Sequence, residues 1–486
     1  MRVVFLASEC APLAKVGGLA DVVGSLPKAL ERLGNEIAII IPRYGNLDTM
    51  KYKLTLVKKN LEVEFNKKVE KFNLYKTKLP QSNDIEIYLI ENPIISSDGV
   101  YLDPSATSLG GGKEESVRFS FFSKAALEVL LNIVDTCDVI HLNDWHVSIV
   151  PALIKQNFSR FEKLHKAAIV LTIHNLGHSY QGISDISILK VLELNLMGPQ
   201  DLAWNYENDG INFLMEGILG SDMVSTVSPS YAKEITTAEY CEGLCDVIKI
   251  KEHRMRGILN GIDYQIFDPQ KDPAIFANYS IENFPNGKLA NKRSLQKETG
   301  LPQNDDMLIG LVSRIDDQKG IDLVIEAIPR LAEMSVQLII LGTGVKEYEE
   351  ILKKLAKNSN PFKFFALFDA KLASKIYAAS DVFLMPSKFE PCGLGQMISM
   401  RYGTLPIVRA TGGLKDTVED GSTGFVFEKY SSSELVEAVQ RTMQKFSQKG
   451  IWNDMIKLAM QKDFSWQRSA QEYVKLYEEA VKIHNY

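Results

Sequence analysis

The N-terminal stretch that decides the fold reads RVVFLASECAPLAKVGGLADVVGSLPKALERLG (residues 2–34). The apolar run at residues 3–8 predicts a buried β-strand, and the helical pattern at 21–33 ends at Gly34. A turn with two glycines joins them, as is typical of a βα unit, and residues 36–41 predict the next strand. Near-continuous apolar strands separated by helices indicate a parallel sheet that is covered on both faces.

The same alternation continues along the chain and predicts two doubly wound, Rossmann-like α/β domains that face each other across a cleft. Further strands are expected at 139–143, 169–174 and 223–227, and a second series at 308–312, 337–341, 364–368, 382–385 and 405–408. Residues 54–91 alternate polar and apolar side chains, which predicts antiparallel hairpins inserted into the first domain. Doubly wound domains bind ligands at the carboxyl ends of their strands, so the cleft is the expected active site.

Domain boundaries follow from changes in this pattern. We predict a first domain at 1–245, a charged and weakly periodic linker at 246–256, and a second domain at 257–463. Residues 464–486 form an amphipathic helical segment that we expect to pack back on the first domain.

Bulk composition excludes several classes of protein. The formal net charge of -6 disfavours a nucleic-acid binder, and no apolar run approaches the roughly 20 residues that span a bilayer. We therefore expect no nucleic-acid partner, no membrane association and a cytoplasmic location.

The five cysteines do not suggest a disulfide framework, because their number is odd and they are scattered. Cys241 and Cys245 are four residues apart with His253 near them, but no second pair of metal ligands follows. We favour two small thiols over a zinc site.

The turn at residues 15–19 has the composition of an anion site. Gly17 and Gly18 allow close approach of backbone N–H groups, Lys15 adds a mobile positive charge, and the helix that begins near Asp21 offers its positive end. These features suit a diphosphate. The alternative is a tight βα turn with a solvated lysine.

Two strand-end loops of the second domain carry a similar signal. Arg314 and Lys319, five residues apart, can converge on a pair of phosphates, unless they pair with Asp316 and Asp317. In FEPCGLGQ (residues 389–396), Glu390 can bind sugar hydroxyls or stabilise positive charge at an anomeric carbon. Its alternative role is to cap its own helix. Gly393 and Gly395 open the start of that helix, and Thr411 begins another glycine turn.

Polar residues also follow two strands of the first domain. His174 ends one strand and is either a cleft residue or a hydrogen-bonded core residue. Asp144 precedes Trp145, a combination that suits a sugar because the ring packs on the pyranose and the carboxylate binds hydroxyls. The alternative for Trp145 is a core anchor.

In this order, the segments resemble the bacterial glycogen synthase and plant starch synthase family over nearly the whole chain. The motifs that carry the resemblance are SE (8–9), PRY (42–44), NDWH (143–146), HNL (174–176), TVSPSYA (226–232), LNGID (259–263), SR (313–314), QKG (318–320), FEPCGL (389–394) and RYGTLP (401–406). The resemblance implies a GT-B fold and a retaining glucosyltransferase. The enzyme would move glucose from ADP-glucose, or UDP-glucose, to the non-reducing end of glycogen or another α-1,4-glucan. It implies no metal and no cofactor.

The resemblance also implies roles for individual residues. Glu390, His174, Lys15, Arg314 and Lys319 would form the catalytic set, with Lys15, Arg314 and Lys319 at the diphosphate. The donor would further contact Gly17, Gly18, Asp21, Asp144, Asn260, Phe368, Gly393, Leu394, Gly395 and Thr411. Phe368 replaces the family's usual Tyr, which keeps a stack on adenine but loses a hydroxyl contact. Gly395 replaces Thr or Asn, and residues 177–179 lengthen a loop expected on the acceptor side.

Two rival functions remain open. The first is another retaining transferase of this architecture, and many of those carry a second Glu eight residues after the first, where this chain has Ile398. A glucan-binding scaffold without catalysis is the other rival, although every charged donor position is present. A radiolabelled donor assay separates these readings.

Overall fold

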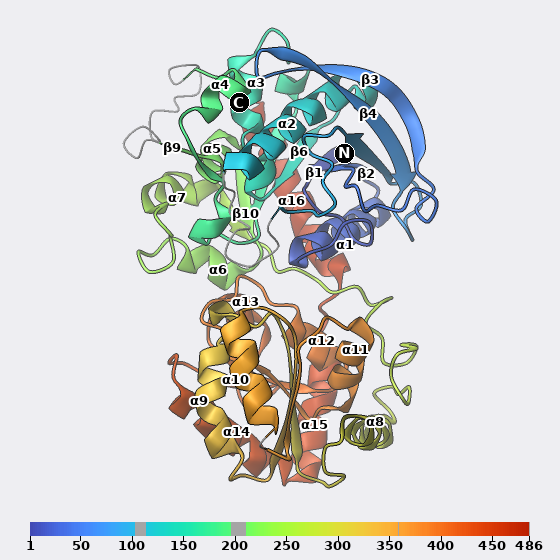
Figure 1. Ribbon diagram of the computed structural model, residues 1–486, viewed down its shortest axis with the longest axis vertical. Coiled ribbons are helices and arrows are strands. Elements are labelled where there is room, and N and C mark those ends of the chain that lie inside the picture. The colour runs from blue at the N-terminus through green and yellow to red at the C-terminus, as the bar shows by residue number, and fades with distance from the viewer. Residues whose placement is uncertain (103–112, 196–209, 358, 486) are drawn as a thin grey trace. The chain divides into compact units, whose positions relative to one another are not determined.

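The computed structural model describes residues 1–102, 113–195, 210–357 and 359–485 and divides into two compact units (Figure 1). The first unit is Met1–Gly261 with Trp466–Tyr486, and the second is Ile262–Ser465. The linker predicted at 246–256 is therefore wrong. These residues form most of helix α7 (Cys245–Lys251) and reach β11 (Met255–Gly257), which pairs with the sheet of the first unit. A helix this short buries only Val247 and Ile248, which is too few residues to show a period.

The first unit is built on a nine-stranded sheet in the order β11-β10-β7-β6-β1-β2-β5-β4-β3. Its strands are β1 (Arg2–Leu6), β2 (Glu36–Pro42), β3 (Thr55–Phe65), β4 (Lys68–Lys78), β5 (Glu86–Glu91), β6 (Val139–Asn143), β7 (Ala168–Ile173), β10 (Met223–Thr226) and β11. β8 (Ile183–Asp185) and β9 (Gly210–Asn212) form a separate antiparallel pair. The predicted parallel strands of this unit are confirmed within one or two residues.

The antiparallel hairpin predicted within residues 54–91 is also confirmed. β3 pairs antiparallel with β4, and β4 pairs antiparallel with β5. β5 then pairs parallel with β2, so the hairpin extends the main sheet instead of forming a separate insertion. Figure 1 shows β3 and β4 as the long curved ribbon at one edge of this unit.

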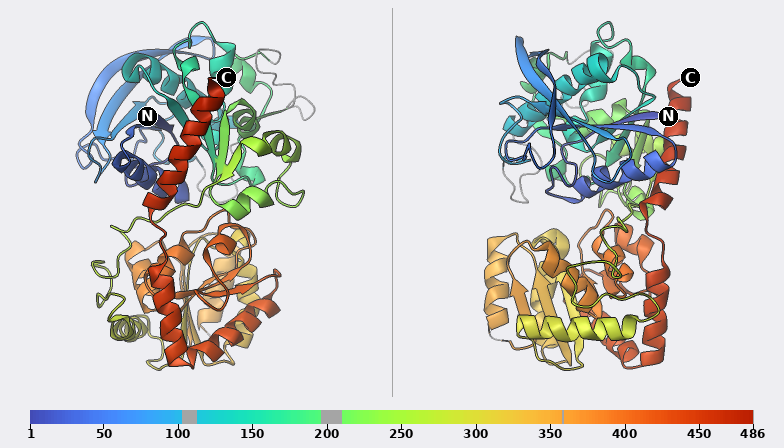
Figure 2. Two further views of the ribbon diagram at one scale, coloured as in Figure 1. Left: turned by 180° about the vertical axis from the view of Figure 1, so that it is seen from behind. Right: turned by 90° about the vertical axis from the view of Figure 1, so that its right-hand side faces the viewer.

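Helices cover both faces of the first sheet. They are α1 (Gly18–Arg32), α2 (Lys113–Val129), α3 (Val150–Gln156), α4 (Ile188–Leu192), α5 (Phe213–Gly220), α6 (Pro229–Glu234), α7 and α16 (Trp466–His484). A π-helical segment, η1 (Leu130–Val134), continues α2. Short 3-10 helices are η2 (Trp145–Val147), η3 (Leu164–Lys166), η4 (His178–Tyr180) and η6 (Glu252–Arg254). The C-terminal helix α16 packs beside α1 across one face, where Figure 2 shows it in red (left view).

A buried polar chain ties α16 to the sheet. The hydroxyl of Tyr477 lies 2.9 Å from Nδ1 of His141, and Nε2 of His141 lies 2.7 Å from Oγ1 of Thr172. Burial lowers the pKa of His141 to about 3, so its ring is neutral. The C-terminal segment is thus part of the first unit's core, although the whole second unit precedes it in the chain.

The second unit has a six-stranded, fully parallel sheet in the order β14-β13-β12-β15-β16-β17. Its strands are β12 (Met307–Val312), β13 (Val336–Leu341), β14 (Phe362–Phe365), β15 (Val382–Met385), β16 (Leu405–Arg409) and β17 (Phe425–Phe427). Its helices are α8 (Phe284–Thr299), α9 (Ile321–Leu331), α10 (Lys346–Lys357), α11 (Ala370–Ala379), α12 (Gly395–Arg401), α13 (Gly412–Thr417), α14 (Ser432–Phe446) and α15 (Lys449–Gln461), with a turn η7 (Asp317–Lys319).

The helices of the second unit lie in two layers. α9, α10 and α14 pack together on one face, and α8 packs on α11 and α12 on α15 on the other (Figure 1). The strand predicted at 364–368 lies at Phe362–Phe365 instead, and Asp369 caps α11 by accepting N–H groups of Lys371 and Leu372. β17 was not predicted, since it is only three residues long.

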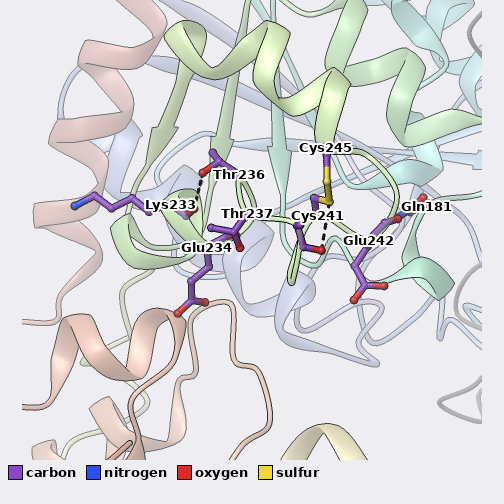
Figure 3. The surroundings of a disulfide bond; sticks show 9 residues. Gln181, Lys233, Glu234, Thr236, Thr237, Cys241, Glu242 and Cys245 are labelled. Carbon is purple, nitrogen blue, oxygen red and sulfur yellow. Dashed lines mark hydrogen bonds between the residues drawn. A yellow bond between two sulfur atoms is a disulfide. The ribbon is translucent and has the colours of Figure 1, made fainter.

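The two clustered cysteines form a disulfide, so the expectation of free thiols there is wrong (Figure 3). The turn between them, with Gly243 at φ +86°, brings their Cα atoms to 5.0 Å. Cys10, Cys137 and Cys392 are free. Within the described ranges, the structure brings together no group of three or more His, Cys, Asp or Glu side chains able to hold a metal ion. None of the described helices combines the length and apolar character needed to cross a bilayer.

Candidate active site

The glycine turn of the first unit is held from inside the protein by Glu9. Oε2 of Glu9 accepts the backbone N–H groups of Val16 at 2.6 Å and Gly17 at 2.9 Å. Of the two glycines predicted to offer N–H groups to a ligand, Gly17 thus has its N–H group bonded to Glu9 in this structure. Gly18 opens α1, and Gly17 is its N-cap residue without a side-chain cap.

Lys15 is not simply solvated. Its Nζ lies 2.5 Å from Oδ1 of Asp21, and its side chain is 45% exposed. The two predicted site residues are thus neighbours, and an anion that binds here would compete with Asp21 for the lysine.

Glu9 itself was not assigned to the site from sequence. It is almost fully buried, and burial raises its pKa. Its other oxygen, Oε1, accepts the hydroxyl of Tyr101 at 2.6 Å, and the hydroxyl of Tyr44 donates to the carbonyl of Ser8. Two signals in the sequence could have identified it: Glu9 directly follows the first predicted strand, and it belongs to the SE motif (8–9) that contributes to the family resemblance.

Asp144 and His174 come together at the ends of the adjacent strands β6 and β7. The backbone N–H of His174 donates to Oδ1 of Asp144 at 2.7 Å, and Nε2 of His174 lies 3.1 Å from Oδ1 of Asn143. Burial raises the pKa of Asp144 to about 7 and lowers that of His174 to about 3. The site therefore presents a neutral imidazole beside a carboxyl group that changes charge near neutral pH.

Trp145 is a core anchor rather than an exposed stacking platform. Its side chain is completely buried, and its ring makes edge contacts with Phe119 and Phe213. A Cβ on Gly182 would lie 2.2 Å from that ring. The alternative of a core role, left open from the sequence, is the one that the structure supports.

The lengthened loop after His174 is a defined turn. Gln181, which follows this loop, donates from Nε2 to the carbonyls of Leu176 (3.0 Å) and Glu242 (2.9 Å), and its Oε1 accepts from Asn212 at 2.6 Å. Glu242 lies inside the disulfide turn, as Figure 3 shows. The disulfide turn thus supports the loop.

Asn260 lies at the end of the first unit's main segment and is buried. Among the described residues, its side-chain Oδ1 has no hydrogen-bond partner. An unpaired buried acceptor is costly, so this atom is ready to accept a hydrogen bond.

In the second unit, Lys319 and Glu390 form an ion pair. Nζ of Lys319 lies 2.6 Å from Oε2 of Glu390, and the Ser387 hydroxyl donates to the same oxygen at 3.0 Å. Glu390 therefore does not cap its own helix. The Arg314 guanidinium pairs with Asp316 at 2.7 Å and donates to Gln318 at 2.9 Å. Pairing with Asp316 is the alternative given for Arg314 in the sequence analysis.

Two glycines allow the strand-end loops to approach each other. A Cβ on Gly320 (φ +69°) would lie 2.2 Å from the carbonyl oxygen of Pro386, and a Cβ on Gly412 (φ +44°) would lie 1.9 Å from that of Glu390. Only glycine fits at these distances. The loops after β12, β15 and β16 therefore meet around Glu390.

The remaining predicted residues divide into two groups. Gly393 lies beside Glu390, Leu394 and Gly395 begin α12, and Thr411 precedes α13 with a buried Oγ1 that lacks a partner among the described residues. Phe368 lies after the edge strand β14 and is 87% exposed. The first group lies on the loops after β15 and β16, which meet at the backbone of Glu390, whereas Phe368 follows a strand that is separated from β12 by β13.

Comparisons with known proteins agree with this geometry. The family described as "Starch synthase catalytic domain" matches residues 2–250, and the family described as "Glycosyl transferases group 1" matches residues 292–449. The chain is 43% identical to a glycogen synthase of Thermosipho africanus and 41% identical to one of Thermotoga maritima, each over 99% of both chains.

Solved structures show the same relationship. The catalytic domain of starch synthase IV from Arabidopsis thaliana, bound to ADP and acarbose, superposes with a TM-score of 0.89 at 33% identity over 99% of both chains. A sucrose-phosphate synthase from Thermosynechococcus elongatus shares the fold, with a TM-score of 0.62 at 18% identity over 98% of both chains. The two Rossmann-like units thus have the GT-B fold, and the chain belongs to the glycogen and starch synthase family of retaining glycosyltransferases.

Proposed function

We propose that the glucosyl donor is ADP-glucose and that the acceptor is the non-reducing end of glycogen or another α-1,4-glucan. The observation that carries the donor class is the Lys319–Glu390 pair beside Arg314, which sets two cations and a carboxylate at adjacent strand ends. Two cations suit a diphosphate, and a buried carboxylate suits sugar hydroxyls. The adenine nucleotide is supported by the ADP that the similar starch synthase IV holds.

Each predicted residue has a proposed role. Arg314 and Lys319 hold the diphosphate, with Gly393, Leu394, Gly395 and Thr411 at the neighbouring turns. Glu390 binds glucose hydroxyls near the anomeric carbon, and Phe368 stacks on adenine. In the first unit, Lys15 leaves Asp21 to contact the donor together with Gly18, while Gly17 positions the turn through Glu9. Asp144, His174 and Asn260 line the glucose pocket.

The proposed reaction needs no metal and no covalent protein nucleophile. Arg314 and Lys319 stabilise the leaving diphosphate, so the anomeric C–O bond breaks ahead of attack and leaves an oxocarbenium-like centre. The departing phosphate takes the proton of the acceptor 4-hydroxyl on the same face. The new glycosidic bond then forms with retained configuration. The alternative is a double displacement through Glu390, which a trapped glucosyl-enzyme would support.

A donor competition assay tests this proposal. Incorporation of radiolabelled glucose into glycogen is measured from ADP-glucose and from UDP-glucose, with each unlabelled nucleotide sugar as competitor and with or without EDTA. We expect faster incorporation from ADP-glucose and no effect of the chelator. No incorporation from either donor would contradict the function, and a preference for UDP-glucose would contradict the donor assignment.

The proposed location is the cytoplasm. Fractionation of cells that express the full chain tests this proposal.

A further inference from the structure

Arg409, at the end of β16, holds the loop that carries Glu390. Its side chain is buried, with 8% of the residue exposed. Nε donates to the carbonyl oxygen of Ser387 at 2.8 Å, and Nη2 donates to the carbonyl oxygen of Lys388. These are consecutive residues of the loop between β15 and Glu390. The planar guanidinium fixes both carbonyls with one rigid group, which a lysine cannot do.

Ser387 links Arg409 to the carboxylate of Glu390. Ser387, whose carbonyl accepts from Arg409, donates its own hydroxyl to Oε2 of Glu390 at 3.0 Å. Lys319 reaches the same carboxylate oxygen at 2.6 Å. Glu390 is therefore oriented from two sides, and one side depends on the position of Ser387.

Arg409 is itself fixed from the other side. Its guanidinium carbon lies 5.7 Å from the centre of the Tyr430 ring, and the Tyr430 hydroxyl donates to Oδ1 of Asp322 on α9 at 2.5 Å. Within the part of the chain that the structure describes, the guanidinium makes no ion pair with a carboxylate. A buried cation without a counter-charge is stabilised only by its hydrogen bonds and by the ring. Its position and that of the loop therefore depend on each other.

We propose that Arg409 is a positioning residue for glucosyl transfer, which acts through Ser387 to orient the Glu390 carboxylate. This inference rests on the proposed role of Glu390 at the reaction centre. The competing explanation is that Arg409 only stabilises the fold of the second unit. The two differ in what they predict for turnover at saturating substrate.

The test compares Arg409→Met, Arg409→Lys and a control, Arg441→Met. Arg441 also donates to a backbone carbonyl in this unit, that of Val426, but it is half exposed and pairs with Asp420. We expect Arg409→Met to lower kcat by about tenfold or more with donor KM changed less than about threefold, since only an interaction that strengthens in the transition state is lost. Arg409→Lys should lie between wild type and Arg409→Met, and Arg441→Met should leave both constants within about twofold.

A double-mutant cycle with Ser387→Ala decides whether Arg409 acts through Ser387. If it does, the double variant is no more than about threefold slower than the worse single variant, because both changes remove the same interaction. The inference would be overturned if the loss of kcat in the double variant equalled the product of the two single losses. An Arg409→Met variant with normal kcat and a lowered Tm would overturn it as well. If Arg409→Met does not fold, the cycle is run with Arg409→Lys. Glu390→Gln distinguishes failure of this inference from failure of the proposed function. Normal activity of Glu390→Gln would contradict the proposed function. Impaired activity of Glu390→Gln together with normal activity of the Arg409 variants would contradict only this inference.

Discussion

Lys319 and Glu390 are 71 residues apart in sequence, yet Nζ of one lies 2.6 Å from Oε2 of the other. They follow β12 and β15, which are adjacent in the sheet although β13 and β14 separate them along the chain. Both side chains are largely buried, at 18% and 7% exposure. Removal of either partner therefore leaves a poorly solvated charge, so we expect the second unit to be sensitive to changes in this pair.

Replacing Glu390 by Ala should lower kcat by about a hundredfold or more, equivalent to roughly 2.7 kcal/mol of transition-state stabilisation. The reason is that the carboxylate proposed at the anomeric carbon is lost while Lys319 stays unpaired. The initial rate of glucose incorporation into glycogen measures the effect. Glu298→Ala, which removes a more exposed ion pair with Lys375, should be near wild type. A Glu390→Ala variant within tenfold of wild type would refute the central role of Glu390.

Asp144→Asn should change how stability depends on pH. The folded-state pKa of Asp144 is raised to about 7 from an ordinary 3.8, so the folded state keeps a proton that the unfolded state loses between these values. Stability of the wild type therefore falls as pH rises from about 4 to 7, by about 1.4 kcal/mol per unit of pKa shift. Asn carries no such proton, so the stability of Asp144→Asn lacks this pH dependence. The free energy of unfolding of the variant should therefore rise relative to that of the wild type as pH increases from 4 to 8.

Calorimetric Tm values of both proteins across this pH range test the Asp144 prediction. The matched control is Asp135→Asn, because Asp135 is 67% exposed in a surface pair with Lys163. A difference between Asp144→Asn and wild type that stays constant with pH would mean that Asp144 titrates normally in the folded protein.

Gly412→Ala should damage both stability and catalysis. The added Cβ would lie 1.9 Å from the Glu390 carbonyl oxygen, so the loops must separate, at a cost of about 2 kcal/mol or more. We expect a lowered Tm and kcat reduced at least about tenfold. Gly450→Ala is the control, because its Cβ would meet nothing within 4 Å in α15, and it should raise stability by up to about 1 kcal/mol. Equal behaviour of the two variants would show that the close approach at Gly412 does not exist.

Phe368→Ala should raise the KM for ADP-glucose about fivefold or more and leave kcat nearly unchanged. The ring is 87% exposed, so its removal costs little stability, but it would remove a stacking surface worth about 1 kcal/mol. Steady-state kinetics with varied donor measure this effect. Leu367→Ala, at a neighbouring residue with 41% exposure, should bind donor normally. An unchanged KM in Phe368→Ala would place the adenine elsewhere.

His484 should stabilise the attachment of α16 at low pH. A hydrogen bond with Asp222 raises the pKa of His484 above its ordinary 6.5, and Nε2 lies 2.7 Å from the carbonyl oxygen of His165. Because the pKa of His484 is higher in the folded than in the unfolded protein, its protonation stabilises the fold fully below pH 6.5. This stabilisation is lost as pH rises through the pKa of His484 in the folded protein. The contribution is modest, about 0.5–1 kcal/mol, because the side chain is partly exposed.

His484→Gln therefore should lower Tm more at pH 6 than at pH 8.5, as measured by calorimetry. His253→Gln serves as the control, because His253 lies in the turn η6, where no residue is buried. The same loss at both pH values would show that the charge of His484 has no part in its effect.

The sequence by itself determined the βα units and the places where chemistry can occur. Buried strands and amphipathic helices leave periodic signals within ten to twenty residues, and glycine turns mark the strand ends. That information was enough to predict two Rossmann-like domains, the hairpin of β3 and β4, and loops rich in charge at residues 15–19, 314–320 and 389–396. It failed where elements are short, as at α7, β17 and the proposed linker.

Only the tertiary structure decided which side chains are partners. Strand order is not chain order, so sequence spacing does not indicate that Lys319 meets Glu390 or that Arg409 holds Ser387. The same holds for Glu9, which accepts hydrogen bonds from two N–H groups of the glycine turn that would otherwise be available to a ligand. The physical reason is that hydrophobic periodicity is a local property of the chain, whereas a hydrogen bond or ion pair between distant segments exists only after the sheet has brought their strand ends together.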